Sequence, residues 1–274
     1  MSRRVPQPSM LSTDHPQGDP RVEGSRRDLE AESLSPSLAL DRSRGAAFEM
    51  KFLLDRALAD QVRTWAGAHL LPDPHGDAAL GNAYDVTTTY LDTKDLDIAR
   101  RALGAGARKF RMRRYGTDMA VWLEHKLRRK DRVRKLRCVV SAGELAQLAE
   151  LGTVTEWGGR WFHEQVLDRE LIPACCIAYR RSAFFATTPE GPVRLTLDRD
   201  VRGVLHSGWD VPHVESGTPI LPASVICEMK FRAALPTILK GLIAKLGLTA
   251  GGVSKYRQFM EAAGSVPKSS EPHA

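Results

Sequence analysis

Charged side chains alternate with apolar ones in four short segments of this sequence. The segments are FEMKFLL (48–54), ARKFRMRRY (107–115), MAVWLEHKLR (119–128) and VICEMKFR (225–232). Because successive residues of a strand point to opposite faces, each segment would form a strand with one charged face and one apolar face. The charged faces hold Glu49 and Lys51; Lys109, Arg111 and Arg113; Glu124, Lys126 and Arg128; Glu228 and Lys230.

The chemistry of these faces depends on the direction in which they point. Pointing outward, they would be the solvated surface of an ordinary sheet. Pointing inward, they would line a cationic tunnel, which needs an anion because like charges repel strongly there. Lysine and arginine hold phosphate oxygens and glutamate holds a divalent metal, so the inward arrangement fits a chain of phosphates. Recurrence of the pattern in four segments favours the inward arrangement.

Positive charge is concentrated in one stretch of the chain. The protein has 274 residues and a formal net charge of +7, yet residues 100–137 contain fifteen lysines and arginines against three acidic residues. This stretch predicts a polyanionic partner or substrate. A protein that binds RNA or DNA would place aromatic side chains among these cations, and only Phe110, Tyr115 and Trp122 are available. Nucleic acid is therefore not the expected partner.

The chain is predicted to contain one domain between two disordered ends. Residues 1–45 are rich in serine and proline and contain no aromatic residue, and the tail 264–274 has a similar character. Residues 46–263 are expected to form the domain. The sequence has no apolar run long enough to span a bilayer and no secretory signal. Because its four cysteines also lack the spacing of metal ligands, we expect a cytoplasmic protein.

Strands dominate the predicted domain. Besides the four segments above, the strands expected are 86–92, 132–140, 176–187 and 193–201. The helices expected are 55–70, 141–152, 234–248 and 254–263. Ser141 and Glu144 have the spacing of a capping box. About eight strands with few helices predict an α+β fold, in which an antiparallel sheet closes into a barrel or tunnel with helices packed outside.

Seven motifs follow one another in the order found in VTC domains. They are EMKF (49–52), KFRMRRYG (109–116), LEHK (123–126), YRRSAF (179–184), VRLTLD (193–198), CEMK (227–230) and SKY (254–256). Over residues 46–262 the chain thus resembles the polyphosphate polymerase domain of the vacuolar transporter chaperone (VTC) family, within the triphosphate tunnel metalloenzyme superfamily. The resemblance implies an antiparallel β tunnel lined by basic residues.

The resemblance also implies roles for individual residues. The phosphate contacts that it implies are Lys51, Arg111, Arg113, Lys126, Arg181, Arg194 and Lys255. Lys109 shares a face with Arg111, and Lys230 and Ser254 are further tunnel residues expected to bind substrate. Glu228 matches the metal ligand of the family, and Glu124 is a second candidate. The first strand reads Phe48-Glu49-Met50-Lys51 and lacks the ExExK pattern of the related CYTH group, which favours a polymerase over a triphosphatase.

The implied reaction is phosphoryl transfer from a nucleoside triphosphate, ATP, to the end of an inorganic polyphosphate chain. Arg111, Arg113 and Lys126 would hold the triphosphate, and Mn²⁺ or Mg²⁺ on Glu228 would neutralise its charge. With water as the acceptor, the same site would be a triphosphatase; without turnover, it would be a module that binds polyphosphate or nucleotide. Eukaryotic members of the family are tethered to membranes by other segments, so a membrane partner is a further candidate.

Overall fold

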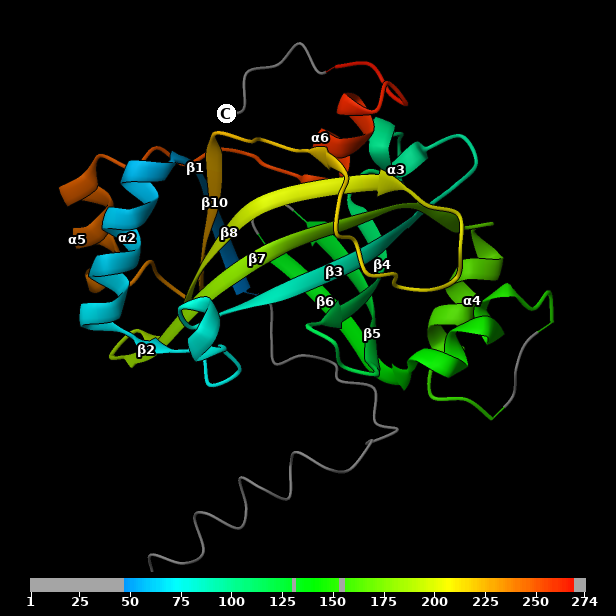
Figure 1. The fold of residues 1–274 in the computed structure, drawn as a ribbon, viewed down its shortest axis with the longest axis horizontal. Helices are drawn as coiled ribbons and strands as arrows, with labels where there is room; N and C mark the ends of the chain where they lie inside the picture. The colour runs from blue at the N-terminus through cyan, green and yellow to red at the C-terminus, as the bar shows by residue number, and fades with distance from the viewer. Residues whose placement is uncertain (1–46, 130–131, 153–155, 269–274) are drawn as a thin grey trace, which may run out of the picture. The chain divides into compact units, whose positions relative to one another are not determined.

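The computed structural model describes residues 47–129, 132–152 and 156–268 of the chain. The predicted disordered segment 1–45 and residues 269–274 of the predicted tail lie outside the described residues. The described part is an α+β fold built on one large antiparallel sheet (Figure 1). No helix in this part is both long enough and apolar enough to cross a membrane.

All eight predicted strands are present, and two short ones join them. The strands are β1 (Ala47–Asp55), β2 (Leu71–Pro72), β3 (Ala83–Asp92), β4 (Arg108–Tyr115), β5 (Ala120–Arg129), β6 (Arg132–Ser141), β7 (Ile172–Thr188), β8 (Gly191–Leu205), β9 (Thr218–Pro219) and β10 (Ser224–Phe231). The helices are α2 (Arg56–His69), α3 (Asp97–Arg100), α4 (Arg160–Asp168), α5 (Thr237–Leu246) and α6 (Lys255–Ala262). Two 3-10 helices are η1 (Ala78–Leu80) and η2 (Ala142–Ala149).

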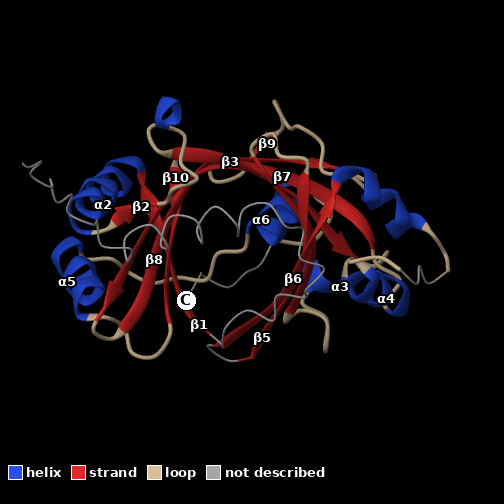
Figure 2. Ribbon diagram, turned by 90° about the horizontal axis from the view of Figure 1, so that it is seen from below, coloured by secondary structure: helices blue, strands red, loops and turns tan. Residues whose placement is uncertain are grey.

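Eight of the strands form a circuit in which each strand pairs with the two next to it. Their order is β7-β3-β4-β5-β6-β1-β10-β8, and β8 pairs in turn with β7, so the ladders lead back to the first strand (Figure 2). Among the described residues, the ladder between β1 and β6 is short and consists of the pairs Ala47–Val133 and Phe48–Arg132. Beyond it, the segment before α6 occupies the free edge of β1, where the Gly251 amide donates to the Lys51 carbonyl.

Helices cover the apolar faces of the strands. Phe110, Met112 and Leu123 of β4 and β5 are buried in a core that includes Phe162 of α4 and Leu145 of η2. A second core joins β1, β8 and β10 to α2 and α5, which lie side by side in Figure 1. Because successive strand residues point to opposite faces, the charged residues that alternate with these apolar ones face away from both cores.

Local signals explain where several helices begin. The Asp55 side chain accepts a hydrogen bond from the Leu58 amide (2.7 Å) at the start of α2. The capping box predicted at Ser141 is present, but the turn that it begins is a 3-10 helix that ends at Ala149. Helix α4 was not predicted, because Gly159 at its N-terminus has no side chain to signal a cap.

The last helix is fixed against the sheet by an aromatic residue and a glycine. A Cβ atom on Gly203 of β8 would collide with the ring of Phe259 in α6, so the absence of a side chain lets the helix lie directly on the strand. Beyond α6, residues 264–268 fall within the predicted tail, yet they are described here and Val266 is buried in the core. These contacts hold Ser254 and Lys255, at the start of α6, against the charged face of the sheet.

Candidate functional site

The register of the ladders places opposite charges next to each other on one face. Directly opposed residues of antiparallel strands share a face. The opposed pairs are Lys51 and Glu228, Glu49 and Lys230, Arg111 and Glu124, and Arg181 and Asp198. Contacts also join strands that are not ladder neighbours, since Lys126 of β5 donates to Glu49 of β1 at 3.0 Å. The charged faces therefore point toward one another, in agreement with the inward arrangement.

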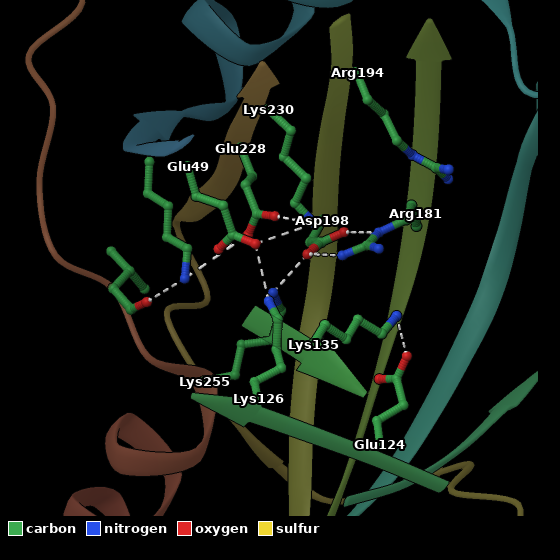
Figure 3. Close-up of polar contacts among 12 residues, drawn as sticks. Glu49, Glu124, Lys126, Lys135, Arg181, Arg194, Asp198, Glu228, Lys230 and Lys255 are labelled. Atoms are coloured by element: carbon green, nitrogen blue, oxygen red, sulfur yellow. Dashed lines mark hydrogen bonds and ion pairs between the residues drawn. The ribbon is translucent and has the colours of Figure 1, made fainter. Parts of the chain in front are cut away.

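Glu49 and Glu228 form what we call the carboxylate pair. The Lys230 Nζ atom lies 2.6 Å from Glu228 Oε1 and 3.5 Å from Glu49 Oε1, so one ammonium bridges the two glutamates (Figure 3). Lys51 Nζ lies 3.8 Å from Glu228 Oε2 and donates to the Val253 carbonyl at 3.2 Å. Among the described residues, every cation that contacts this pair is a lysine.

Both members of the carboxylate pair are ionised at neutral pH. Burial and the neighbouring Glu228 raise the pKa of Glu49, but Lys230, Lys126 and Lys51 outweigh them and lower it to about 2. Burial likewise raises the pKa of Glu228, and the same three lysines hold it well below its usual range. Burial and the charge of Lys230 lower the pKa of Lys126 to about 8, against the opposing effect of Glu49.

Glu124 lies at the centre of a second group, the arginine cluster, made of Arg111, Arg113, Glu124 and Lys135. Arg111 contacts Glu124 Oε2 through Nε at 2.6 Å and through Nη2 at 2.5 Å. Lys135 contacts the other oxygen, and Arg113 Nη1 lies 3.8 Å from Oε2. Glu124 is 0% exposed. Burial raises its pKa, but Arg111, Arg113 and Lys135 hold the pKa well below its usual range.

A third group surrounds Asp198 of β8. Arg181 of β7 donates to both carboxylate oxygens, at 2.6 and 2.8 Å, and Lys255 Nζ donates at 2.5 Å. The ring of Tyr179 lies beside both cations, 4.5 Å from Lys255 Nζ and 5.2 Å from Arg181 Cζ. Burial raises the pKa of Asp198, and Arg181 with Lys255 lowers it further than burial raises it. This group carries the start of α6 to the charged face.

A cavity of about 650 Å³ opens beside the carboxylate pair. Of the residues predicted to bind substrate, Lys51, Lys109, Lys126 and Ser254 line it. Lys109 Nζ donates to the Ser254 hydroxyl at 2.9 Å, which joins β4 to the start of α6. Arg194 lies elsewhere, because its guanidinium donates to Asp73 at 2.6 Å and to the Tyr84 hydroxyl at 3.1 Å. Figure 3 shows Arg194 apart from the three groups.

The carboxylate pair fits a divalent metal better than Glu124 does. The resemblance to VTC domains implies Mn²⁺ or Mg²⁺, and no group of three or more metal-ligating side chains is present among the described residues. Mg²⁺ is usually held by one or two carboxylates together with substrate phosphates and water, so two glutamates are enough. Side chains of Glu49 and Glu228 are 11% and 12% exposed, whereas both oxygens of Glu124 are contacted by cations and fully buried.

Sequence reasoning missed three charged residues of these groups. Glu49 lies on a predicted charged face, Asp198 in the VRLTLD motif and Lys135 in the cationic stretch, but none of the three was assigned a role from the sequence. Asp198 lies two residues after Thr196 and four after Arg194, so strand alternation would have placed it on the same face as Arg194. His125 lies between Glu124 and Lys126 in the sequence, so its side chain is on the opposite face of β5. There it stacks on Phe110, with 4.3 Å between the ring centroids.

Comparison with known proteins identifies a family and a number of matching solved structures. The family model described as "VTC domain" matches residues 46–263. No curated protein matches the sequence. A candidate adenylyl cyclase from Hippeastrum, described as having a dominant triphosphatase activity, is 15% identical with a TM-score of 0.47, over 81% of this chain and 96% of its own. A candidate adenylate cyclase from Bacillus halodurans is 10% identical with a TM-score of 0.48, over 77% and 94% of the two chains.

Proposed function

Since this chain belongs to the VTC domain family, we propose that it moves the terminal phosphoryl group of a nucleoside triphosphate, ATP first, onto inorganic polyphosphate. In this proposal the eight strands of the closed circuit enclose a tunnel. The three charged groups and the cavity lie on its inner wall. The start of α6 contributes Ser254 and Lys255 to that wall.

The observation that carries the proposal is an excess of cations on this wall. Glu49, Glu124, Asp198 and Glu228 are its carboxylates in the three groups. The cations are Lys51, Lys109, Arg111, Arg113, Lys126, Lys135, Arg181, Lys230 and Lys255. Arg194 is a further cation, which lies apart from the three groups. Positive charges that are buried together repel one another, and a polyanion relieves that repulsion. Triphosphate and polyphosphate are unbranched polyanions of this kind.

Positioning and charge stabilisation would supply most of the catalysis. A terminal oxygen of polyphosphate forms a bond to the γ-phosphorus of the nucleoside triphosphate. The bond between that phosphorus and the β,γ-bridging oxygen breaks, and the nucleoside diphosphate leaves with the electron pair. Arg111 and Arg113 present guanidinium groups, each of which can donate two parallel hydrogen bonds to phosphate oxygens. Lys126 adds a mobile ammonium, and phosphoryl transfer requires no covalent intermediate on the protein.

The remaining cations keep the substrates in line. Lys51, Lys109, Lys230, Arg181, Arg194 and Lys255, with the Ser254 hydroxyl, would bind phosphates on either side of the reacting one. Glu228 and Glu49 would hold Mn²⁺ or Mg²⁺, which when bound neutralises charge on the transferred group. Glu124 has a different role in this proposal, because it contacts Arg111 and Arg113 and fixes the positions of their side chains.

The test is an assay with purified protein, ATP and either Mn²⁺ or Mg²⁺. The assay resolves free phosphate from long-chain polyphosphate, with metal chelator as the control. We expect metal-dependent formation of long-chain product. Release of free phosphate alone would identify a triphosphatase, in which water replaces the polyphosphate end. Tight binding of ATP and polyphosphate with neither product would identify a binding module and contradict the proposed transferase.

A further inference from the structure

Asp92, the last residue of β3, is a buried carboxylate that joins two helices. Its side chain accepts hydrogen bonds from the Ile98 and Ala99 amides of α3, both at 2.9 Å. The Tyr256 hydroxyl of α6 donates to it at 2.6 Å. One side chain thus connects the end of the strand to α3 and to the first turn of α6, and these two helices lie next to each other (Figure 1).

The two helices that Asp92 joins supply part of the cavity lining. Arg101, which follows α3, and Ser254 and Arg257 at the start of α6 all line the cavity. Leu96 and Arg101, on either side of α3, have left-handed backbones with φ of 60° and 57°. Residues other than glycine adopt this conformation at an energetic cost, so α3 needs contacts from outside to keep its shape. Asp92 provides such contacts at the start of α3.

The position of the Tyr256 side chain is closely determined. Its ring stacks on Tyr90 of β3, with 5.1 Å between the centroids and 14° between the planes. Burial raises the pKa of Tyr256, and the neighbouring Asp92 carboxylate raises it further. The hydroxyl therefore stays protonated at neutral pH and remains a hydrogen-bond donor. Stacking and the hydrogen bond together fix the rotation of the first turn of α6.

Lys255 precedes Tyr256 and points in another direction, because successive residues of a helix are about 100° apart around its axis. Its Nζ atom donates to Asp198 at 2.5 Å, and a phosphate would compete for this contact. Asp198 then keeps Arg181 as its partner. The bond from Tyr256 to Asp92 is different, because the two residues are 2% and 0% exposed and a phosphate has no access to it.

We propose that Asp92 and Tyr256 are positioning residues, which fix the first turn of α6 so that Lys255 is directed at a phosphate of the substrate. Neither residue touches the substrate. Asp92 acts through Tyr256, and Tyr256 acts through the adjacent Lys255. The inference rests on the proposed function for the contact between Lys255 and phosphate, and it adds the residues that keep this contact in place when Lys255 leaves Asp198.

The test is a double-mutant cycle in affinity for tripolyphosphate, measured by calorimetric titration of the full chain in chelator. Lys255→Met removes a charged donor and should weaken binding about tenfold or more. Tyr256→Phe keeps the ring but loses the bond to Asp92, and it should weaken binding about threefold to tenfold. Because Tyr256 acts through Lys255, the double variant should match Lys255→Met within about twofold.

Thr89→Val is the matched control for the loss of a buried hydroxyl. Thr89 lies in the same strand as Asp92, is 0% exposed and donates to the Asp210 carbonyl at 2.7 Å. Urea denaturation should show that Thr89→Val and Tyr256→Phe are both less stable than the parent. Affinity should fall only in Tyr256→Phe. If folded Tyr256→Phe binds tripolyphosphate as tightly as the parent, its role is confined to stability and the inference is overturned.

The cycle has a second outcome that would contradict the inference. If the double variant is weakened by the product of the two single effects, the two residues act independently. Unchanged affinity of Lys255→Met would remove Lys255 from the phosphate site, and the inference with it. These results do not depend on turnover, so a parent protein that shows the coupling but forms no long-chain product would contradict only the proposed transferase.

Discussion

Glu124 and Glu228 come from sequence motifs that look alike, LEHK and CEMK, yet they lie in opposite surroundings. Glu124 is enclosed by two arginines and a lysine that reach both of its oxygens. Among the residues that the structure describes, only lysines contact Glu228, which lies beside Glu49 with its side chain 12% exposed. Arginine makes a rigid, forked contact, whereas lysine ends in a mobile point charge that can move to another partner.

The difference shows how one residue type serves two purposes on the same wall. An enclosed glutamate compensates buried cations and fixes their positions, so its main effect is on folding. A glutamate held by mobile lysines can exchange them for a metal ion or a phosphate, so its main effect is on chemistry. The four predictions below follow from this contrast between the arginine cluster and the carboxylate pair.

The largest effect is expected from Glu124→Gln. Loss of this buried charge leaves Arg111, Arg113 and Lys135 uncompensated, which should lower the free energy of unfolding by about 3–5 kcal/mol. Urea denaturation at neutral pH measures this. Glu164→Gln, in an exposed pair on α4, is the control and should change stability by less than about 1 kcal/mol. A Glu124→Gln variant as stable as the parent, but deficient only in metal binding, would reverse the assignment of the two glutamates.

Glu228→Gln should leave the fold intact and strongly reduce metal-dependent turnover. The amide keeps the shape of the side chain but removes charge that a divalent cation needs. Metal-dependent turnover should fall about a hundredfold or more, while triphosphate affinity in chelator is retained because the cations remain. Turnover with Mn²⁺ and calorimetric titration in chelator separate these effects. Normal turnover with Mn²⁺ would show that the carboxylate pair is not the metal site.

Arg113→Ala should have an intermediate effect and act on affinity even without metal. It removes a charge-assisted donor worth about 1.5–3 kcal/mol, which corresponds to a loss of about tenfold to a hundredfold in triphosphate affinity. Titration of a non-hydrolysable nucleotide with chelator, then with Mn²⁺, measures it. Thr88→Val is the matched control, because the Thr88 hydroxyl accepts from Arg113 at 3.1 Å and its loss leaves the guanidinium in place. Unchanged metal-free affinity of Arg113→Ala would remove Arg113 from the phosphate site.

Strand alternation predicted much of this site and failed at identifiable points. Alternation depends on local backbone geometry, so it placed Lys109, Arg111 and Arg113 on one face and Phe110 on the other. It carries no information on which residues of different strands meet on the charged face. That pairing depends on ladder register and on the course of the chain before α6, which is why Glu49 could not be distinguished from Glu124 as the partner of Glu228. Asp198 was missed although its own strand was predicted.

The smallest effect expected is a pH dependence that originates at the carboxylate pair. Lys126 contacts Glu49, and its pKa is about 8 in the folded protein. The ammonium is mostly protonated at pH 7 and mostly neutral at pH 9, so raising the pH removes one positive charge from the proposed phosphate site. Since the protonated form attracts the anion, affinity for tripolyphosphate should decrease as the pH rises through 8. Lys126→Arg keeps its charge over this range, and its titration also corrects for ionisation of the ligand. Between pH 7 and pH 9 the affinity of the parent should fall about threefold to tenfold more than that of Lys126→Arg. Calorimetric titration in chelator at a series of pH values measures both proteins.

Lys135, whose pKa is lowered to about 7 by burial, is the corresponding lysine of the arginine cluster. A decrease centred near pH 7, which persists in Lys126→Arg and disappears in Lys135→Arg, would move the pH-sensitive contact with phosphate from the carboxylate pair to the arginine cluster.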